Sequence, residues 1–217
     1  MSSHVKTSSE RSFQERLVQE LTKYKWDAPD HLDGNKQRVT VDDLVNHWRS
    51  ELNRINADQL EGVPLTDNEF KQVKAKVAQI QNSFEAAKVL AMEGSTGKID
   101  GIYRDDNPKV TRRQITLTIF KKAEVRGGDS SYKIAREIST PNGNRFDLVL
   151  LINGLPLINI EQKGADKTLD EAFWQFRRYY RDGEYTNNFM AFSQMMVIMS
   201  EVATRYFATP KTINDFN

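Results

Sequence analysis

Apolar residues recur three or four positions apart through the first half of the chain, which is the spacing of an amphipathic helix. The stretches with this pattern are residues 12–25, 41–55 and 66–92. Two of them open with Ser or Thr followed three positions later by Glu, the arrangement of a capping box, at Ser12–Glu15 and Thr66–Glu69. The turn-rich segment 93–108 interrupts the pattern, and we expect it to cross the surface as a loop.

The pattern changes after Pro108, where β-branched and other apolar residues gather in short runs separated by turn residues. These runs predict strands at 113–120, 132–139, 145–152 and 156–163. A helix follows from Thr168, with Glu171 as the partner in a third capping box and Gly183 as its end. The apolar run 195–200 then predicts a buried strand parallel to a neighbour, because a helix precedes it. This order of elements predicts an α+β (mixed α/β) fold.

Composition narrows the function classes. The chain has 217 residues, no cysteine and a net charge of +1. Disulfides and thiolate metal sites are therefore excluded, and any nucleic-acid binding must come from local basic patches rather than from overall charge. No apolar run is long enough to span a membrane, and the N-terminus lacks the apolar stretch of a signal peptide. We expect a cytoplasmic protein with no membrane partner.

Three charged residues stand inside the apolar strands: Asp147 in one, Glu161 and Lys163 in the next. Charges there are costly unless they are paired or bind a metal. Glu161 and Lys163 project from one face of their strand, because side chains alternate along a strand. A two-residue turn at 153–154 would direct Asp147 to the other face. A three-residue loop or a bulge would bring Asp147 opposite Glu161, and we predict an odd loop or a bulge.

Two neighbouring carboxylates repel each other, and a divalent cation relieves that repulsion. Oxygen ligands favour Mg²⁺ or Mn²⁺ over Zn²⁺. A lysine two positions away could orient an attacking water and stabilise charge on a phosphate. Together these groups suit metal-assisted hydrolysis of a phosphodiester. The alternative is structural, with Asp147 and Lys163 forming a salt bridge and Glu161 at its rim.

Asp147 followed at a distance by Glu161-Gln162-Lys163 resembles the core of the PD-(D/E)XK nuclease superfamily, with Phe146 in place of the proline that names it. More narrowly, the chain resembles the N-terminal nuclease domain of the restriction (R, motor) subunit of type I restriction–modification enzymes. The stretches that carry this resemblance are "NRFDLVLLINGLPLINIEQK", "AFWQFRRYY" and "TRYFA". In that family a glutamine–tyrosine pair on the following helix accompanies the catalytic residues, and here the pair is Gln175 and Tyr179.

The resemblance implies roles for these residues. Asp147, Glu161 and the main-chain carbonyl of Gln162 would bind Mg²⁺ or Mn²⁺, and Lys163 would orient the nucleophilic water. Gln175 and Tyr179 would support the site or contact DNA. A glutamate from the first helix often joins such sites, and the candidates are Glu10, Glu15 and Glu20. Arg177, Arg178 and Arg181 on the Gln175 helix could bind phosphates, although a solvated helix face would look the same.

The resemblance also implies a PD-(D/E)XK nuclease-like core with a central mixed sheet flanked by helices and an N-terminal helical elaboration. We expect residues 10–217 to form one nuclease domain, with a helical insert at about 41–92 and a catalytic core at about 113–208. Residues 1–9 are expected to be a disordered tail. The family implies an ATP-driven motor after the nuclease, and this chain contains no Walker motif for ATP. We therefore expect it to be a fragment of a longer polypeptide.

The implied activity is metal-dependent cleavage of double-stranded DNA without strong sequence preference. In the family an ATP-driven motor follows the nuclease, so ATP would bind only in that region. The methyltransferase (M) and specificity (S) subunits would be partners, and a fragment without the motor could be inactive. The competing interpretation is a non-catalytic DNA-binding or subunit-assembly module on the same fold. A nuclease acting on RNA is a more distant alternative.

Overall fold

A computed structural model describes residues 8–91, 96–121, 128–164 and 168–216. Its α-helices are α1 (Ser8–Thr22), α2 (Val41–Ile55), α3 (Asp67–Val77), α4 (Ser83–Leu90) and α5 (Leu169–Arg181). Its strands are β1 (Val39–Thr40), β2 (Thr96–Tyr103), β3 (Gln114–Lys121), β4 (Tyr132–Ser139), β5 (Arg145–Ile152), β6 (Leu155–Gln162), β7 (Met195–Met199) and β8 (Thr204–Ala208). Short 3₁₀ turns lie at Asp30–Leu32, Phe189–Phe192 and Ile213–Asp215.

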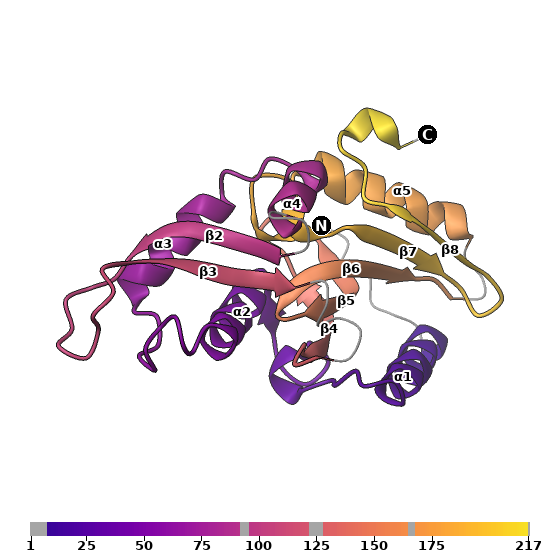
Figure 1. Cartoon of the computed structure of the whole chain (residues 1–217). Helices are drawn as coiled ribbons and strands as arrows, with labels where there is room; N and C mark the ends of the chain where they lie inside the picture. Colours follow the sequence, from indigo (N-terminus) through magenta and orange to yellow (C-terminus); the bar gives the residue numbers. More distant parts are fainter. Residues whose placement is uncertain (1–7, 92–95, 122–127, 165–167, 217) are drawn as a thin grey trace.

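A six-stranded mixed sheet in the order β1-β4-β5-β6-β7-β8 forms the centre of the molecule. The pairs β1–β4 and β6–β7 are parallel, and the other neighbours are antiparallel. The predicted parallel strand at 195–200 is therefore confirmed as β7. Figure 1 shows α5 along one face of β6, β7 and β8, and α1 on the opposite side of the sheet. Helices on both faces of a mixed sheet confirm the predicted α+β class.

Within the segment expected to be a surface loop, 93–108, residues Thr96–Tyr103 form the strand β2, and residues 93–95 lie outside the described residues. β2 pairs antiparallel with β3 as a separate two-stranded sheet, with Ile99 opposite Leu117 and Ile102 opposite Ile115. All four of these side chains are buried. Bulges and a positive φ at Gly101 break the alternation along β2, which explains why its sequence looked like turns. β3 is thus a strand as predicted, but it does not belong to the central meander.

The first helix begins at Ser8, four residues earlier than its predicted start. The predicted capping box at Ser12 and Glu15 is wrong, because Ser12 lies inside α1 and its hydroxyl accepts a hydrogen bond from Arg16 at 2.9 Å. Of the predicted disordered tail, Ser8 and Ser9 belong to the helix, and residues 1–7 lie outside the described residues. Val18 of α1 packs with Leu148, Leu150 and Ile160 on the sheet.

The predicted helix 66–92 is two helices. The capping box of Thr66 and Glu69 is confirmed at the start of α3. α3 ends at Val77, and Asn82 caps a new helix by accepting hydrogen bonds from the backbone N–H groups of Phe84 and Glu85. α2 is confirmed over 41–55, with Leu44, Trp48 and Leu52 buried on one face. The N-terminal helical elaboration therefore exists, and α2, α3 and α4 gather at the β2–β3 end of the molecule (Figure 1).

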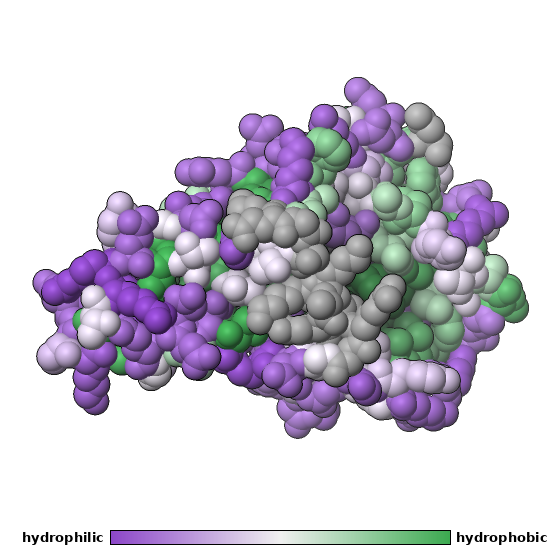
Figure 2. Space-filling view, viewed as in Figure 1, coloured by the Kyte–Doolittle hydropathy of each residue, from purple (hydrophilic) through white to green (hydrophobic). Residues whose placement is uncertain are grey.

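The surface differs between the two ends of the molecule. On the face in Figure 2, polar side chains cover the end formed by α3, β2 and β3, and apolar side chains gather over β7 and β8. Val202 and Tyr206 contribute to the exposed apolar surface of that second end. Among the described residues, no helix has the length and apolar character needed to cross a membrane.

Candidate active site

The hairpin of β5 and β6 sets the register of the site. Ile152 faces Leu155, so the turn contains only Asn153 and Gly154, both with positive φ, and of the two predicted alternatives the odd loop is not the one that the chain adopts. The predicted bulge is present: the register shifts between Leu150 and Leu151. The tight turn fits under α2 because Gly154 has no side chain. A Cβ at this position would lie only 2.8 Å from the Cα of Trp48.

Beyond the bulge, Leu148 pairs with Ile160, so the next position sets Asp147 opposite Glu161. Directly opposed residues of an antiparallel pair project to the same face, as the sequence argument required. Both side chains are buried, with exposed fractions of 5% and 1%. The Asp147 carboxylate also accepts a hydrogen bond from the main-chain N–H of Gln162 at 2.8 Å. The two carboxylates therefore occupy one buried location where β5 begins and β6 ends.

Lys163 joins this location to α5. Its ammonium lies 3.0 Å from a carboxylate oxygen of Glu161 and donates to the side-chain oxygen of Gln175 at 2.6 Å. Lys163 therefore pairs with Glu161, whereas the structural alternative required a pair with Asp147. Since the lysine remains partly exposed, it can reach a bound molecule.

Gln175 and Tyr179 continue the network along one face of α5. The Gln175 amide donates to the Tyr179 hydroxyl, which donates to the main-chain oxygen of Arg145 at 2.7 Å. Burial raises the pKa of Tyr179, and the nearby Glu161 carboxylate raises this pKa further. The hydroxyl therefore stays protonated at neutral pH and holds Gln175 toward Lys163.

The three candidate glutamates of the first helix have different partners. Glu10 accepts a hydrogen bond at 3.2 Å from the main-chain N–H of Gly164, the residue after Lys163. Glu15 pairs with Arg136 at 2.6 Å, and exposed Glu20 pairs with Lys23 at 2.6 Å. Glu10 is therefore the candidate that the fold brings beside the site.

The three arginines of α5 have different surroundings, and the guanidinium of Arg178 lies 5.3 Å from the ring centre of Tyr179. Arg178 and Arg181 are exposed, whereas Arg177 is half-buried with its guanidinium 5.5 Å from the ring centre of Trp174. Arg181 also pairs with Asp182 at 3.3 Å. Their role in phosphate binding stays a prediction.

Sequence reasoning missed Gln14 and Glu137. The buried Gln14 amide donates to the Glu137 carboxylate at 2.9 Å and to the main-chain oxygen of Asp147 at 3.3 Å. Glu137 has a φ of 53°, in the left-handed region that a strand residue rarely adopts. A glutamine four positions before Val18, on the apolar face of α1, was the available sign of a polar contact. Nothing in the sequence marked the conformation of Glu137.

The donor set fits a hard divalent cation. Mg²⁺ is commonly held by one or two carboxylates together with waters and substrate phosphates, and Asp147 and Glu161 supply two. No group of three or more His, Cys, Asp or Glu side chains suited to a metal occurs among the described residues. Such a site would therefore be completed by main-chain oxygen, water or substrate. Ligation by the Gln162 carbonyl stays a prediction.

An α+β domain with paired carboxylates and a lysine at the end of its central sheet is the class that the structure defines. The model of the family "Type I restriction enzyme R protein N terminus" matches residues 7–215, and the chain belongs to this family. It is 33% identical over 177 residues to the type I restriction enzyme SauMSSORF170P endonuclease subunit of Staphylococcus aureus (strain MSSA476), a match covering 79% of this chain and 17% of that protein.

Two further relatives carry similar names. The SsaAORF53P endonuclease subunit of Staphylococcus saprophyticus is 34% identical, over 76% of this chain and 16% of the relative. The EcoprrI endonuclease subunit of Escherichia coli is 32% identical, over 56% of this chain and 35% of the relative. The match to the two staphylococcal subunits thus spans about a sixth of their length.

Proposed function

We propose that this chain is the nuclease domain of a type I restriction enzyme R subunit, and that it hydrolyses phosphodiester bonds of double-stranded DNA in a Mg²⁺- or Mn²⁺-dependent reaction. One observation carries the proposal: Lys163, bonded to Glu161 and Gln175, stands at the strand end where Asp147 and Glu161 lie opposite each other. The family membership and the printed names of the relatives support it.

Each residue has a role that its contacts favour. Asp147, Glu161 and the Gln162 carbonyl would hold the cation, whose charge would offset the charge that develops on the scissile phosphate. Lys163 would orient the attacking water, whose oxygen forms the new bond to phosphorus as the bond to the leaving sugar oxygen breaks. Gln175 and Tyr179 would act as positioning residues, because Gln175 accepts a hydrogen bond from Lys163 and Tyr179 accepts one from Gln175.

The remaining expectations concern the longer protein. Because the staphylococcal relatives are much longer than the matched segment, we propose that an ATP-driven motor accompanies this domain and that ATP binds only there. Methyltransferase and specificity subunits would assemble with it and supply target recognition. Cleavage by the nuclease domain itself would show little sequence preference.

The decisive experiment compares Asp147→Ala and Lys163→Ala in the complete restriction complex. Both variants should lose cleavage of plasmid DNA that carries the target site, whereas Lys88→Ala, an exposed change on α4, should cleave normally. A calorimetric Mg²⁺ titration should also lose its binding signal with Asp147→Ala. Normal cleavage by either site variant would favour the competing function, a non-catalytic DNA-binding or assembly module.

A further inference from the structure

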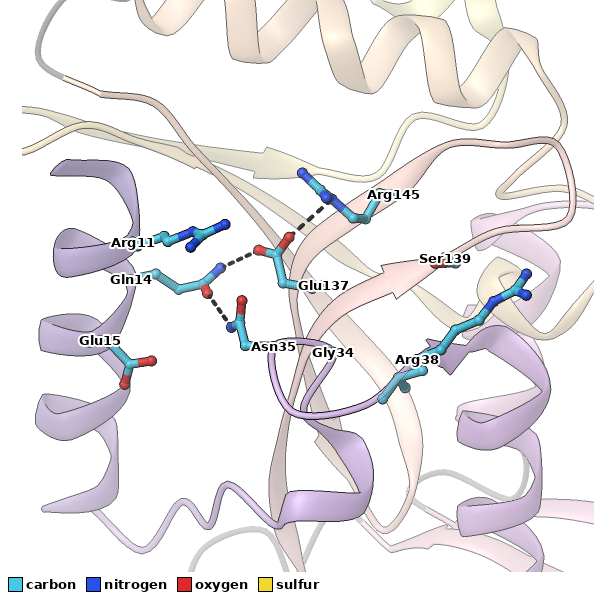
Figure 3. Close-up of a pocket in the computed structure, with 10 residues that line it drawn as sticks. Arg11, Gln14, Glu15, Gly34, Asn35, Arg38, Glu137, Ser139 and Arg145 are labelled. Atoms are coloured by element: carbon cyan, nitrogen blue, oxygen red, sulfur yellow. Dashed lines mark hydrogen bonds and ion pairs between the residues drawn. The ribbon is translucent and has the colours of Figure 1, made fainter. Parts of the chain in front are cut away.

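A second polar site lies beside the carboxylates, between α1 and the end of the sheet. It is a cavity of about 610 Å³ with an arginine-rich lining. Its wall includes Arg11, Gln14, Asn35, Arg38, Glu137 and Arg145. Figure 3 shows Arg11 and Gln14 projecting from α1 toward Glu137 and Arg145, with Asn35 beneath them and Arg38 on the far side.

The charges of this cavity do not cancel. Its two acidic side chains are already paired, Glu137 with Arg145 at 3.0 Å and Glu15 with Arg136 at 2.6 Å. Arg11 and Arg38 are exposed, and neither forms an ion pair with another described residue. The cavity therefore presents two guanidinium groups that no neighbouring carboxylate neutralises, which favours an anionic ligand.

The floor of the cavity is held by close packing. Gln14 is 1% exposed and bonds to Glu137, while its own side-chain oxygen accepts from the Asn35 amide at 3.2 Å. A Cβ added at Gly34 would overlap the main-chain oxygen of Glu137, so only glycine lets this loop approach β4 so closely. This packing fixes the shape of the cavity floor before any ligand binds.

The cavity and the carboxylates meet at one end of the sheet. Arg145 lines the cavity, its main-chain oxygen accepts from Tyr179, and Asp147 follows two residues later on β5. Two residues span roughly 7 Å along a strand, and successive phosphates of one DNA strand are about 3.4 Å apart along the helix axis. A DNA strand with one phosphate at Asp147 can therefore place a nearby phosphate at Arg145.

We propose that this cavity binds two backbone phosphates of the DNA strand being cut, a few nucleotides from the scissile phosphate, with Arg11 contacting one phosphate and Arg38, on the far side, contacting another. The proposal rests on the proposed nuclease function, since it takes the same strand as ligand. Arg145 is a less suitable position to change, because its removal would leave the buried Glu137 without its ion-pair partner.

The test is the affinity of the full chain for a short fluorescein-labelled DNA duplex, measured by anisotropy in EDTA at several salt concentrations. Arg11→Gln with Arg38→Gln should weaken binding about 10-fold and lower the slope of log K against log salt by about 2. The control removes two charges elsewhere, with Lys71→Gln on α3 and Arg113→Gln before β3, both exposed. The control variant should change the duplex affinity and the salt slope by less than half as much as the cavity variant does.

The outcomes separate this site from the nuclease function. Weakened duplex binding by the cavity variant supports the phosphate site even if Asp147→Ala proves to leave cleavage intact. Unchanged affinity and salt slope, with the fold intact by circular dichroism, overturn it while leaving the nuclease assignment in place. A further outcome would also overturn the proposal. Inorganic phosphate would raise the melting temperature of the unmodified chain but not that of the cavity variant, while the two chains bound the duplex equally well. The cavity would then be a site for free phosphate.

Discussion

The Arg104–Glu69 and Lys163–Glu161 pairs join the same kinds of group, yet their surroundings differ. The Arg104 pair is 2.9 Å long, with both side chains inaccessible to solvent (0% and 1% exposed). The Lys163 pair is 3.0 Å long, and its lysine side chain keeps an exposed fraction of 12%. One pair is closed from every side, whereas the other can be approached from the end of the sheet.

Hydrogen bonding makes the same distinction. Arg104 also donates to the main-chain oxygens of Leu60 and Val63, and Glu69 accepts from the backbone of Thr66 and Asp105. These contacts tie α3 to the segments before and after it. Lys163 instead bonds to Gln175, whose position depends on Tyr179. A buried pair that is fully bonded to backbone serves the fold, and one held by adjustable side chains near solvent can serve chemistry.

The largest expected effect is the loss of stability when the closed pair is broken. Arg104→Ala should lower the free energy of unfolding by about 3–5 kcal/mol, because it leaves Glu69 charged and buried. Urea denaturation followed by circular dichroism measures this change. The double variant Arg104→Met with Glu69→Leu should recover much of the loss. A loss below about 1 kcal/mol for Arg104→Ala would remove the distinction between the two pairs.

Breaking the open pair should affect activity more than stability. Lys163→Ala should reduce DNA cleavage by the complete enzyme at least about 100-fold, as loss of a charge-stabilising donor commonly does. Its free energy of unfolding should fall less, by about 1–2 kcal/mol, because the lysine is partly exposed and its removal lets water reach the buried Glu161 carboxylate. Single-turnover cleavage and urea denaturation measure the two effects. A stability loss equal to that of Arg104→Ala would identify Lys163 as a structural residue.

The parts of this molecule that sequence predicted are those with local causes. The α2 face, the Thr66 cap and the strands β4 to β7 follow from periodicity and turn residues within one segment. The opposition of Asp147 and Glu161 followed from parity and the need for a bulge, and that bulge is present. Of the two predicted alternatives, an odd loop or a bulge, the chain has the bulge together with a two-residue turn, and sequence alone does not decide between them.

The parts that sequence missed depend on contacts between distant segments. β2 is a strand because Ile99 and Ile102 meet β3, although its glycines suggested turns. The cavity beside the site exists because Gln14, Asn35 and Glu137 come from three separate segments. Neither arrangement has a period or motif of its own. Tertiary contact overrides local preference at such places.

A smaller effect on cleavage is expected at Tyr179, which is linked to Lys163 through Gln175. Tyr179→Phe removes the hydroxyl that holds Gln175 and the Arg145 carbonyl, so cleavage should fall about 10-fold, with about 1 kcal/mol lost in stability. Tyr180→Phe is the matched control, because its hydroxyl donates to the Lys211 main-chain oxygen, away from Lys163. The rate of a single turnover at saturating DNA distinguishes the two variants. Equal rates for both would mean that Tyr179 does not position the lysine.

The smallest expected effect is a dependence of the free energy of unfolding on pH that comes from Tyr179, beside the Lys163–Glu161 pair, and not from the Arg104–Glu69 pair. Burial and the Glu161 carboxylate raise the pKa of Tyr179 in the folded chain, whereas an unfolded tyrosine titrates near its ordinary value of about 10. The neutral hydroxyl therefore contributes stability that is fully present below about pH 10 and decreases above it, as the unfolded chain releases its proton.

Urea denaturation between about pH 8 and about pH 11 should show this decline in the unmodified chain. Tyr179→Phe should make the decline shallower, and Arg104→Met with Glu69→Leu should leave it unchanged, because that closed pair is not among the groups that shift the pKa of Tyr179. If the free energy of unfolding of Tyr179→Phe declined as steeply with pH as that of the unmodified chain, burial and the Glu161 carboxylate would not raise the pKa of Tyr179.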